Sequence, residues 1–254
     1  MNVGGISANE AYLRSIVGEA DMAVFGAMEL FRISGWDKKR IHSTLASLER
    51  KGIITRLKRG SYAQTEGLNE HLFRIATELV KPSYISFWTA LSRYGFTEQQ
   101  VMTVQLASPR QARPFSAGDF AIEVATLKPY RFYGYQKMNG AVIAEAEKAL
   151  IDALFRPDLC GGIEEVAACL KRAWHEVNHD TLIEYALGFR NRSLVSRLGH
   201  LIESLGLEMD GIERLLEARA PIFVLLDSKG EKEGEQDRKW RVLVNHRIVL
   251  EDML

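Results

Sequence analysis

Apolar residues in the first part of the chain recur at helical spacing and then give way to a short β-branched run. Ile41, Leu45 and Leu48 stand at i, i+4 and i+7, which predicts one buried helix face. Asp37 stands where a carboxylate caps free backbone N–H groups, and Gly52 stands where a left-handed residue ends a helix at low cost. The pattern therefore predicts a helix between these two caps.

Two short strands are predicted directly after this helix. Residues 53–55 are an Ile-Ile-Thr run, and residues 61–63 are the expected partner strand. Lys58 and Arg59 lie in the turn between them, and Gly60 supplies the positive φ that such a turn requires. A helix followed by a hairpin with a basic tip is typical of the winged helix-turn-helix arrangement.

Two more helices are predicted before residue 36. The first covers residues 9–18, and the second is capped by Asp21 and ends at a turn over residues 34–35. Their apolar positions are Tyr12, Leu13, Ile16 and Val17 in the first helix and Val24, Met28, Leu30 and Phe31 in the second. Three helices and a hairpin predict a small domain over residues 1–66, near the lower size for independent folding.

The remainder, residues 67–254, alternates between strand and helix periods and predicts a larger mixed α/β domain, so the whole chain is expected to be α+β. The predicted strands cover residues 101–107, 119–127, 130–135, 141–143, 222–226 and 240–244. The predicted helices cover residues 70–80, 87–95, 144–155, 163–174, 180–187, 193–205 and 211–218. Residues 109–118 and 229–239 are predicted as polar or charged loops.

Positive charge is concentrated in one short segment of a chain that is neutral overall. The 254 residues contain 33 Lys and Arg and 33 Asp and Glu. Residues 36–60 hold eight Lys or Arg and two acids, which gives +6 in this segment and −6 in the rest of the chain. A basic patch on a neutral protein favours local electrostatic binding of an anionic partner.

The helix predicted after Asp37 carries this charge on the side opposite its apolar stripe. Cations on such a face meet phosphates, and short side chains let the helix approach base edges in the major groove. The predicted DNA-binding residues are Lys39, Arg40, Ser43, Ser47 and Arg50 on the outward face, Lys38 and His42 at its flank, and Lys58 and Arg59 on the hairpin. The pattern favours double-stranded DNA as the partner, although a solvated charged helix gives the same charge run.

Composition also restricts the classes of protein to which this chain can belong. A hydrophobic content of 46% and a charged content of 26% are typical of globular proteins in water. Cys160 and Cys169 fit no disulfide framework or four-ligand metal spacing, so we expect free thiols in a reducing compartment. No apolar run reaches the length of a membrane span, and the N-terminus lacks a signal peptide, so we expect a cytoplasmic protein without a membrane partner.

Four motifs spread along the chain together resemble one family. They are LERKGIITRLKRGSYA at 48–63, KPSYISFWTALSRYGFTEQ at 81–99, AEAEKALIDALFRP at 144–157 and SRLGHLIESLGL at 196–207. In their order and rough spacing, from about residue 10 to the end, the chain resembles the AbiEi antitoxins of bacterial type IV toxin–antitoxin systems, which also act as regulators in phage-defence loci.

The resemblance implies a repressor that binds inverted repeats in the promoter of its own operon. It also implies a C-terminal domain that supports cooperative binding and the antitoxin activity. The functional partner would be a nucleotidyltransferase-like toxin encoded beside it, without a tight complex. An inverted repeat would need two copies of the recognition helix, whether or not the free protein is a monomer. The DNA-reading role carries over only onto the helix and hairpin of residues 36–63, and the residues of the antitoxin role stay unassigned.

The segment HEVNH at residues 175–179 is an alternative candidate, because it matches the zinc-hydrolase pattern H-E-x-x-H. Within one helix, His175 and His179 would share a face and hold zinc, with Glu176 as the general base. A third ligand would be sought at His200 or Glu203. However, Asn178 is a helix-capping residue, so the segment is expected to straddle a helix end, and a break there would spoil the geometry.

Other residue sets point to chemistry less directly. Asp119 and Glu123 would need a lysine at position 125 to complete a nuclease element, but that residue is Ala125. Glu145 and Glu147 stand at a predicted helix start, where carboxylates favour the helix dipole, so we interpret them as structural. An aromatic set that could stack bases comprises Tyr130, Phe132, Tyr133 and Tyr135. If these residues form a strand, the alternation of its faces favours core packing for Phe132.

The sequence therefore predicts a DNA-binding repressor that is not an enzyme and holds no cofactor or metal. The chain contains no Walker A or G-x-G-x-x-G run. Two alternatives stay open. One is a protein-interaction module that keeps the winged fold without reading DNA, and the other is a zinc-dependent hydrolase built on residues 175–179.

Overall fold

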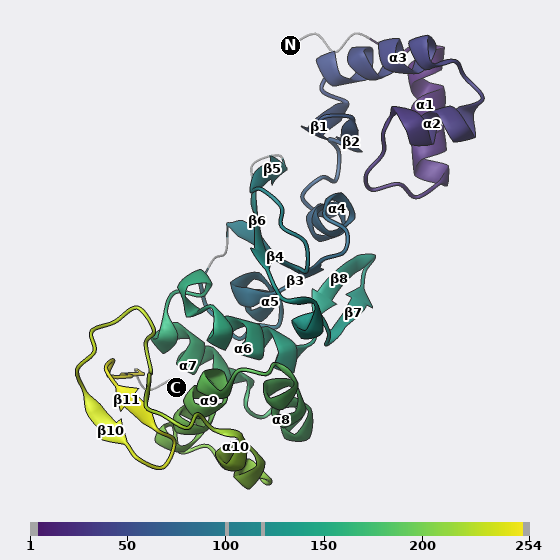
Figure 1. The fold of residues 1–254 in the computed structure, drawn as a ribbon. Helices are drawn as coiled ribbons and strands as arrows, with labels where there is room; N and C mark the ends of the chain where they lie inside the picture. The colour runs from purple at the N-terminus through teal and green to yellow at the C-terminus, as the bar shows by residue number, and fades with distance from the viewer. Residues whose placement is uncertain (1–4, 100–101, 118–119, 251–254) are drawn as a thin grey trace.

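The computed structural model describes residues 5–99, 102–117 and 120–250, and these form an α+β protein, as predicted. An N-terminal unit lies at one end of the molecule in Figure 1, and the chain leaves it through a hairpin. This unit contains α1 (Ala8–Glu19), α2 (Ala27–Ser34), α3 (Lys38–Arg50), β1 (Ile54–Lys58) and β2 (Ser61–Gln64). Helix α3 runs along its outer edge, on the side away from the C-terminal part.

The predicted caps fix both ends of α3. The Asp37 side chain accepts a hydrogen bond from the Arg40 backbone N–H at 2.9 Å. Gly52 has a φ of +69° just past the last turn, so the left-handed ending is also confirmed. The apolar stripe forms a separate N-terminal core, whose buried members are Leu13, Val17, Phe25, Leu30, Ile41, Leu45, Leu48 and Ile54. The sequence predicts the position of α3 because its two caps and its apolar stripe all lie within one short segment.

The hairpin pairs β1 and β2 antiparallel, with Arg56 opposite Tyr62. Gly60 has a φ of +78° in the turn, as predicted. A further backbone bridge lies outside the hairpin. Phe25, between α1 and α2, donates to the Tyr62 carbonyl at 2.9 Å and accepts from the Tyr62 N–H at 2.8 Å. The segment between the first two helices therefore adds a strand position beside β2, which the sequence pattern did not predict.

The prediction that Asp21 caps the second helix is wrong. Helix α2 begins at Ala27, and its N-cap is Gly26, which has no side chain to make a capping bond. Asp21 lies in the preceding loop with a φ of +47°. Its carboxylate instead accepts from the Arg74 guanidinium at 2.8 Å. Asp21 therefore pairs with a residue 53 positions away and does not cap the adjacent helix.

The C-terminal part is built on one mixed sheet with strand order β5-β6-β4-β3-β8-β7 in the described residues. The strands are β3 (Tyr84–Ile85), β4 (Thr103–Ser108), β5 (Phe115–Ala117), β6 (Phe120–Thr126), β7 (Tyr135–Met138) and β8 (Ala141–Ala144). Strands β4 and β6 run parallel in register from Thr103↔Ala121 to Ser108↔Thr126. The short β3 joins the two halves, antiparallel to β4 and parallel to β8.

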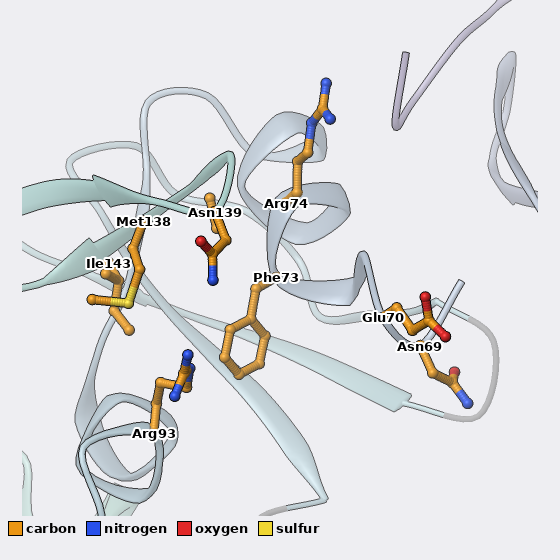
Figure 2. Close-up of a pocket in the computed structure, with 9 residues that line it drawn as sticks. Asn69, Glu70, Phe73, Arg74, Arg93, Met138, Asn139 and Ile143 are labelled. Carbon is orange, nitrogen blue, oxygen red and sulfur yellow. The ribbon is translucent and has the colours of Figure 1, made fainter. Parts of the chain in front are cut away.

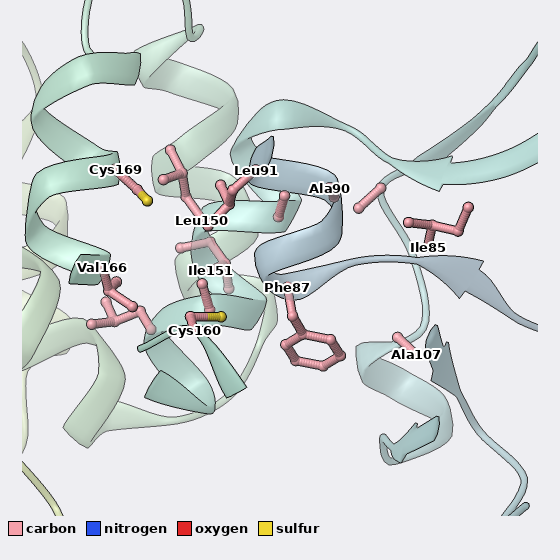
Figure 3. Close-up of a cluster of buried hydrophobic side chains, with 14 of the residues drawn as sticks. Ile85, Phe87, Ala90, Leu91, Ala107, Leu150, Ile151, Cys160, Val166 and Cys169 are labelled. Carbon is pink, nitrogen blue, oxygen red and sulfur yellow. The ribbon is translucent and has the colours of Figure 1, made fainter. Parts of the chain in front are cut away.

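Helices pack on this sheet and on one another, as Figure 1 shows. They are α4 (Leu72–Leu79), α5 (Phe87–Arg93), α6 (Ala146–Phe155), α7 (Ile163–Ala173), α8 (His179–Gly188), α9 (Arg192–Ser204) and α10 (Ile212–Ala218). Side chains of α5, α6 and α7 meet in the main core, which Figure 3 shows with Phe87, Ile151 and Val166. Both cysteines are buried there as free thiols. The central helix α6 is buried on nearly every side.

A second, small sheet closes the chain. Strand β9 (Val224–Leu225) pairs parallel with β11 (Val242–Val244), and β10 (Glu235–Asp237) pairs antiparallel with β11. The charged segment 229–239, predicted as a loop, therefore contains a strand. Trp240 is fully buried beside this sheet, against Gly199 of α9. A Cβ at Gly199 would lie 2.1 Å from the Trp240 ring, so only glycine fits there.

In the main sheet, one predicted strand is misplaced and two strands are not predicted at all. Residues 130–135 were predicted as a strand, but Pro129–Arg131 form a 3-10 turn and the strand begins only at Tyr135. Pro129 favours the turn because its ring fixes φ, and Gly134 has a φ of +68° that interrupts extended backbone. Strands β3 and β5 were missed because each has only two or three residues. Predicted residue 101 lies outside the described residues.

Candidate nucleic-acid interface

The outward face of α3 combines small and basic side chains. Lys39, His42, Ser43 and Arg50 are exposed, and Ala46 lies exposed among them. The Ser43 hydroxyl donates to the Arg40 carbonyl at 2.9 Å, which folds this side chain back onto its own helix. The centre of the face therefore carries only short side chains, and cations surround it. Such a surface allows close approach to a flat or concave partner.

Arg40 is exposed, and it makes contacts that its helical position alone does not predict. Its guanidinium carbon lies 3.8 Å from the centroid of the Trp36 ring. The same guanidinium donates to the Asn9 side chain at 2.6 Å. Trp36 in turn stacks on Tyr12 of α1, with ring centroids 5.0 Å apart. Arg40 thus joins the start of α3 to α1, a role that the spacing of Trp36 four residues earlier could have indicated.

Ser47 lies at the edge of the outward face and is half-buried. Its side chain is one of the groups that lower the pKa of the buried Glu10 carboxyl. The others are Lys51, at 2.7 Å from the carboxylate, and the Ser7 backbone N–H, also at 2.7 Å. Together these contacts lower the pKa of Glu10 to about 2, with Lys51 the largest cause. Ser47 therefore belongs to the α1–α3 contact more than to the open face.

The hairpin tip places its two cations differently. The Lys58 ammonium donates to the Leu79 carbonyl at the end of α4, at 2.8 Å. This bond turns Lys58 toward the C-terminal part. Arg59 is exposed at the tip. Lys38, at the flank, lies 5.9 Å from the Phe31 ring. Both cations are exposed, but of the two only Lys58 forms a side-chain hydrogen bond with the described residues.

Most of the basic side chains in residues 36–60 form no ion pair with the described residues. Across residues 36–60, all of which the structure describes, Lys51 is the cation that forms an ion pair, and its partner is Glu10. Lys39, Arg50 and Arg59 are exposed without such a partner in the described part of the chain. The field of this surface is therefore positive over α3 and the hairpin tip.

The HEVNH segment straddles a helix end, as expected. Helix α7 ends at Ala173, and the Asn178 side chain caps α8 by accepting from the Thr181 N–H at 2.9 Å. His179 opens α8, where its ring stacks on Trp174 with centroids 4.3 Å apart. The two histidines thus do not share one helix. Within residues 5–99, 102–117 and 120–250, no group of three or more His, Cys, Asp and Glu side chains is placed to hold a metal ion.

The remaining candidates form structural contacts where they are described. Glu147 accepts from the Asn178 N–H at 2.7 Å, and Glu145 accepts from the Tyr185 hydroxyl, which ties the start of α6 to α8. Phe132 packs against the main core and lies 5.0 Å from both Tyr84 and Tyr135. Asp119 of the nuclease candidate lies outside the described residues. None of these contacts creates an open site.

Comparison with known proteins shows the fold alone. No protein-family model matches the chain, and no curated protein matches its sequence. The crystal structure of the RV2827C protein from Mycobacterium tuberculosis is similar, with a TM-score of 0.64. The match covers 94% of this chain and 92% of that chain at 13% sequence identity. Both parts of the molecule therefore recur together in another solved structure.

In the described part of the chain, no helix has the length and apolar character needed to cross a membrane.

Proposed function

We propose that this protein binds double-stranded DNA sequence-specifically and represses transcription from its own promoter. In this proposal the N-terminal unit is a winged helix-turn-helix domain. Helix α3 enters the major groove, and the β1–β2 hairpin is the wing that reaches the neighbouring backbone. The C-terminal part then carries the second role that the AbiEi resemblance implies, that of an antitoxin.

The outward face of α3 is the observation that carries the proposal. Ser43 and Ala46 place short side chains at the centre of the face. Lys39 and Arg50 lie beside them and form no ion pair with the described residues. A recognition helix needs this combination, because its backbone must approach base edges while cations meet phosphates. A charged helix that only faces water does not require short side chains at the centre of its exposed face.

The order of elements in the N-terminal unit gives separate support. Helix, bridge strand, two helices and two strands follow one another, and the Phe25–Tyr62 bridge makes the segment between α1 and α2 part of the hairpin sheet. That order is typical of winged-helix domains. The Arg40–Trp36–Tyr12 stack and the Glu10–Lys51 pair hold α3 against α1, so the proposed reading helix is presented rigidly.

Fluorescence anisotropy with labelled DNA from upstream of its own gene tests the proposal. We expect tight binding to this DNA, weak binding to scrambled DNA of the same composition, and a steep fall in affinity with salt. The double variant Lys39→Ala/Arg50→Ala should lose about 10-fold or more in affinity, since one arginine that reads a guanine contributes about 1–3 kcal/mol. Lys232→Ala/Arg238→Ala is the matched control, because it removes the same charge from two exposed positions on either side of β10, outside the N-terminal unit.

Two outcomes would contradict DNA reading by α3. One is equally weak binding to the promoter and the scrambled DNA. The other is an unchanged promoter affinity in the Lys39/Arg50 variant. Either result, together with a stable complex with the product of the adjacent gene, would favour a winged fold used for protein interaction.

The antitoxin role needs its own experiment. The adjacent toxin gene is induced alone, with this protein, and with its Lys39→Ala/Arg50→Ala variant, each under a promoter that the protein does not regulate. We expect growth to be rescued by both forms, because the resemblance assigns the antitoxin activity to the C-terminal part. Failure of the unchanged protein to rescue growth would remove the antitoxin role and leave the repressor role standing.

A further inference from the structure

A cavity of about 240 Å³ lies between α4, α5 and the β7–β8 hairpin, on elements that the proposed DNA interface does not use. Figure 2 shows the Phe73 ring, the Arg93 guanidinium, the Met138 side chain and the Asn139 amide turned toward one common space. We propose that this cavity binds a small molecule that combines a flat apolar ring with an anionic group.

The apolar side of the cavity suits a ring. Phe73 is half-buried and reaches in from α4, while Met138 and Ile143 close the opposite side from the hairpin. Ile143 is only 2% exposed, so this wall belongs to the core. An aromatic face beside aliphatic and thioether groups favours a flat partner that can stack or lie edge-on. Ligand cavities typically combine such walls with a few polar groups.

Arg93 supplies the anion-binding group. It is the last residue of α5 and is exposed, and its guanidinium makes no ion pair or hydrogen bond with the described residues. Arg74 also lines the cavity, but its head points away in Figure 2 and is held by Asp21 and Glu78. A planar guanidinium matches a carboxylate or a phosphate in two parallel hydrogen bonds.

The other polar groups orient the ligand. The Asn139 amide has no hydrogen-bond partner among the described residues, so it can pair with a polar edge of the ring. Glu70 lies on the far side of Phe73 from Arg93 in Figure 2. Its carboxylate repels an anion from that side, which directs the anionic group to the Arg93 end.

The cavity walls are fixed before any ligand arrives. Asn139 and Gly140 have φ values of +50° and +80° in the two-residue turn of the hairpin. Gly140 lies so close to α4 that a Cβ would approach Arg74 Cδ to 2.9 Å. On the other side, the Tyr94 hydroxyl donates to the Ala144 carbonyl at 2.8 Å, which ties the end of α5 to β8. A preformed cavity loses little conformational entropy on binding.

The test is calorimetric titration of the full-length protein with two probes, salicylate for a ring with a carboxylate and AMP for a ring with a phosphate. We expect at least one to bind with a Kd of about 1 mM or lower. Arg93→Gln should weaken that binding at least about tenfold. Arg110→Gln should leave it unchanged, because Arg110 is an exposed arginine that does not line the cavity. Whichever probe binds identifies the anionic group.

Neutral and ring-free compounds complete the test. Benzamide, adenosine and inorganic phosphate should each bind at least about tenfold more weakly than the probe that binds. The proposal is overturned if neither probe binds, if Arg93→Gln binds as well as the unchanged protein, or if phosphate alone binds as tightly as AMP. Because Arg93 is exposed, its variant is expected to fold, and an unaltered circular dichroism melting curve checks this.

Discussion

The Arg74 guanidinium joins the two parts of the molecule through Asp21. Its Nη1 donates to the Asp21 carboxylate at 2.8 Å, and its Nη2 donates to the Asp21 backbone carbonyl. Its Nε donates to Glu78 of the same helix at 2.9 Å, which sets the direction of the side chain. These contacts raise the pKa of Arg74 and lower the pKa of Asp21. One α4 residue therefore holds the loop after α1 by side-chain and backbone contacts.

Arg74→Met should loosen the junction between α4 and the N-terminal unit. It removes both contacts to Asp21, whereas Asp21→Asn keeps the contact to the backbone carbonyl. We expect amide hydrogen exchange over residues 64–72 to accelerate several-fold in Arg74→Met and less in Asp21→Asn. Glu78→Gln is the control, because it leaves the Asp21 contacts intact. Native exchange rates in Arg74→Met would show that this bond does not hold the junction.

The N-terminal unit should lose stability in acid through Glu10. The pKa of Glu10 is lowered from 4.5 to about 2, so its ionised form stabilises the folded state. That contribution is complete above the unfolded value of 4.5 and is lost as the pH falls toward 2. Glu10→Gln should reduce the free energy of unfolding near neutral pH by about 2 kcal/mol. It should also flatten the pH dependence of thermal melting over that window.

Glu66→Gln provides the control for this acid effect. Glu66 also faces a basic residue, Arg14, but its side chain is 86% exposed. We therefore expect its replacement to leave both the melting temperature and its pH dependence nearly native. A Glu10→Gln protein whose melting temperature still falls as steeply as the native one between pH 4.5 and 2 would assign the acid effect to another group.

Lys148 and Asp152 form a fully buried ion pair on α6, and breaking it should be costly. Asp152 also accepts from the Tyr84 hydroxyl at 3.0 Å and the Ser86 hydroxyl at 2.7 Å. Burial lowers the pKa of Lys148. Asp152→Ala leaves the ammonium unpaired and should reduce the free energy of unfolding by about 3–5 kcal/mol in urea titrations.

The double variant Lys148→Met/Asp152→Asn tests whether charge or packing causes this loss. It removes both charges and keeps an oxygen that can accept from Tyr84 and Ser86. We expect it to recover at least half of the stability lost in Asp152→Ala. A double variant as unstable as the single one would show that the ionised pair itself is required.

Gly199→Ala should destabilise the C-terminal sheet, since its Cβ would lie 2.1 Å from the fully buried Trp240 ring. Overpacking of this kind costs about 1–3 kcal/mol. Gly18→Ala in α1 is the opposite case, because the space around Gly18 is open. It should raise stability by up to about 1 kcal/mol through helix propensity. Equal urea midpoints for the two variants would contradict this packing argument.

The sequence predicted the fold where the signals are local. Asp37, the Ile41–Leu45–Leu48 stripe and Gly52 lie within one short segment, so they locate α3 without tertiary information. Asp21 carries the same capping chemistry but is used by Arg74, which no local pattern indicates. Strands β3 and β5 are too short for alternation to be visible. Phe25 likewise gains its strand position only from Tyr62.

For the same reason, the sequence placed only some side chains of the candidate surface. Helical spacing gives direction, so Lys39, Ser43 and Arg50 were correctly placed on the outward face. Spacing does not give the partners of long side chains. Arg40 is held by Trp36 and Asn9. The ammonium of Lys58 similarly bonds to a carbonyl of α4.

Lys58 and Arg59 should therefore behave differently on DNA, although they are adjacent cations at the hairpin tip. If the hairpin is a wing, Arg59→Ala removes a phosphate contact and should weaken all sequences alike, with the log–log salt slope flattened by about one unit. Lys58→Ala should leave that slope unchanged, because its ammonium bonds to the Leu79 carbonyl at 2.8 Å. Anisotropy titrations over a salt series measure both slopes. The reverse result, a flattened slope for Lys58→Ala alone, would mean that Lys58 leaves Leu79 to meet the DNA, and the hairpin would then have to move on binding.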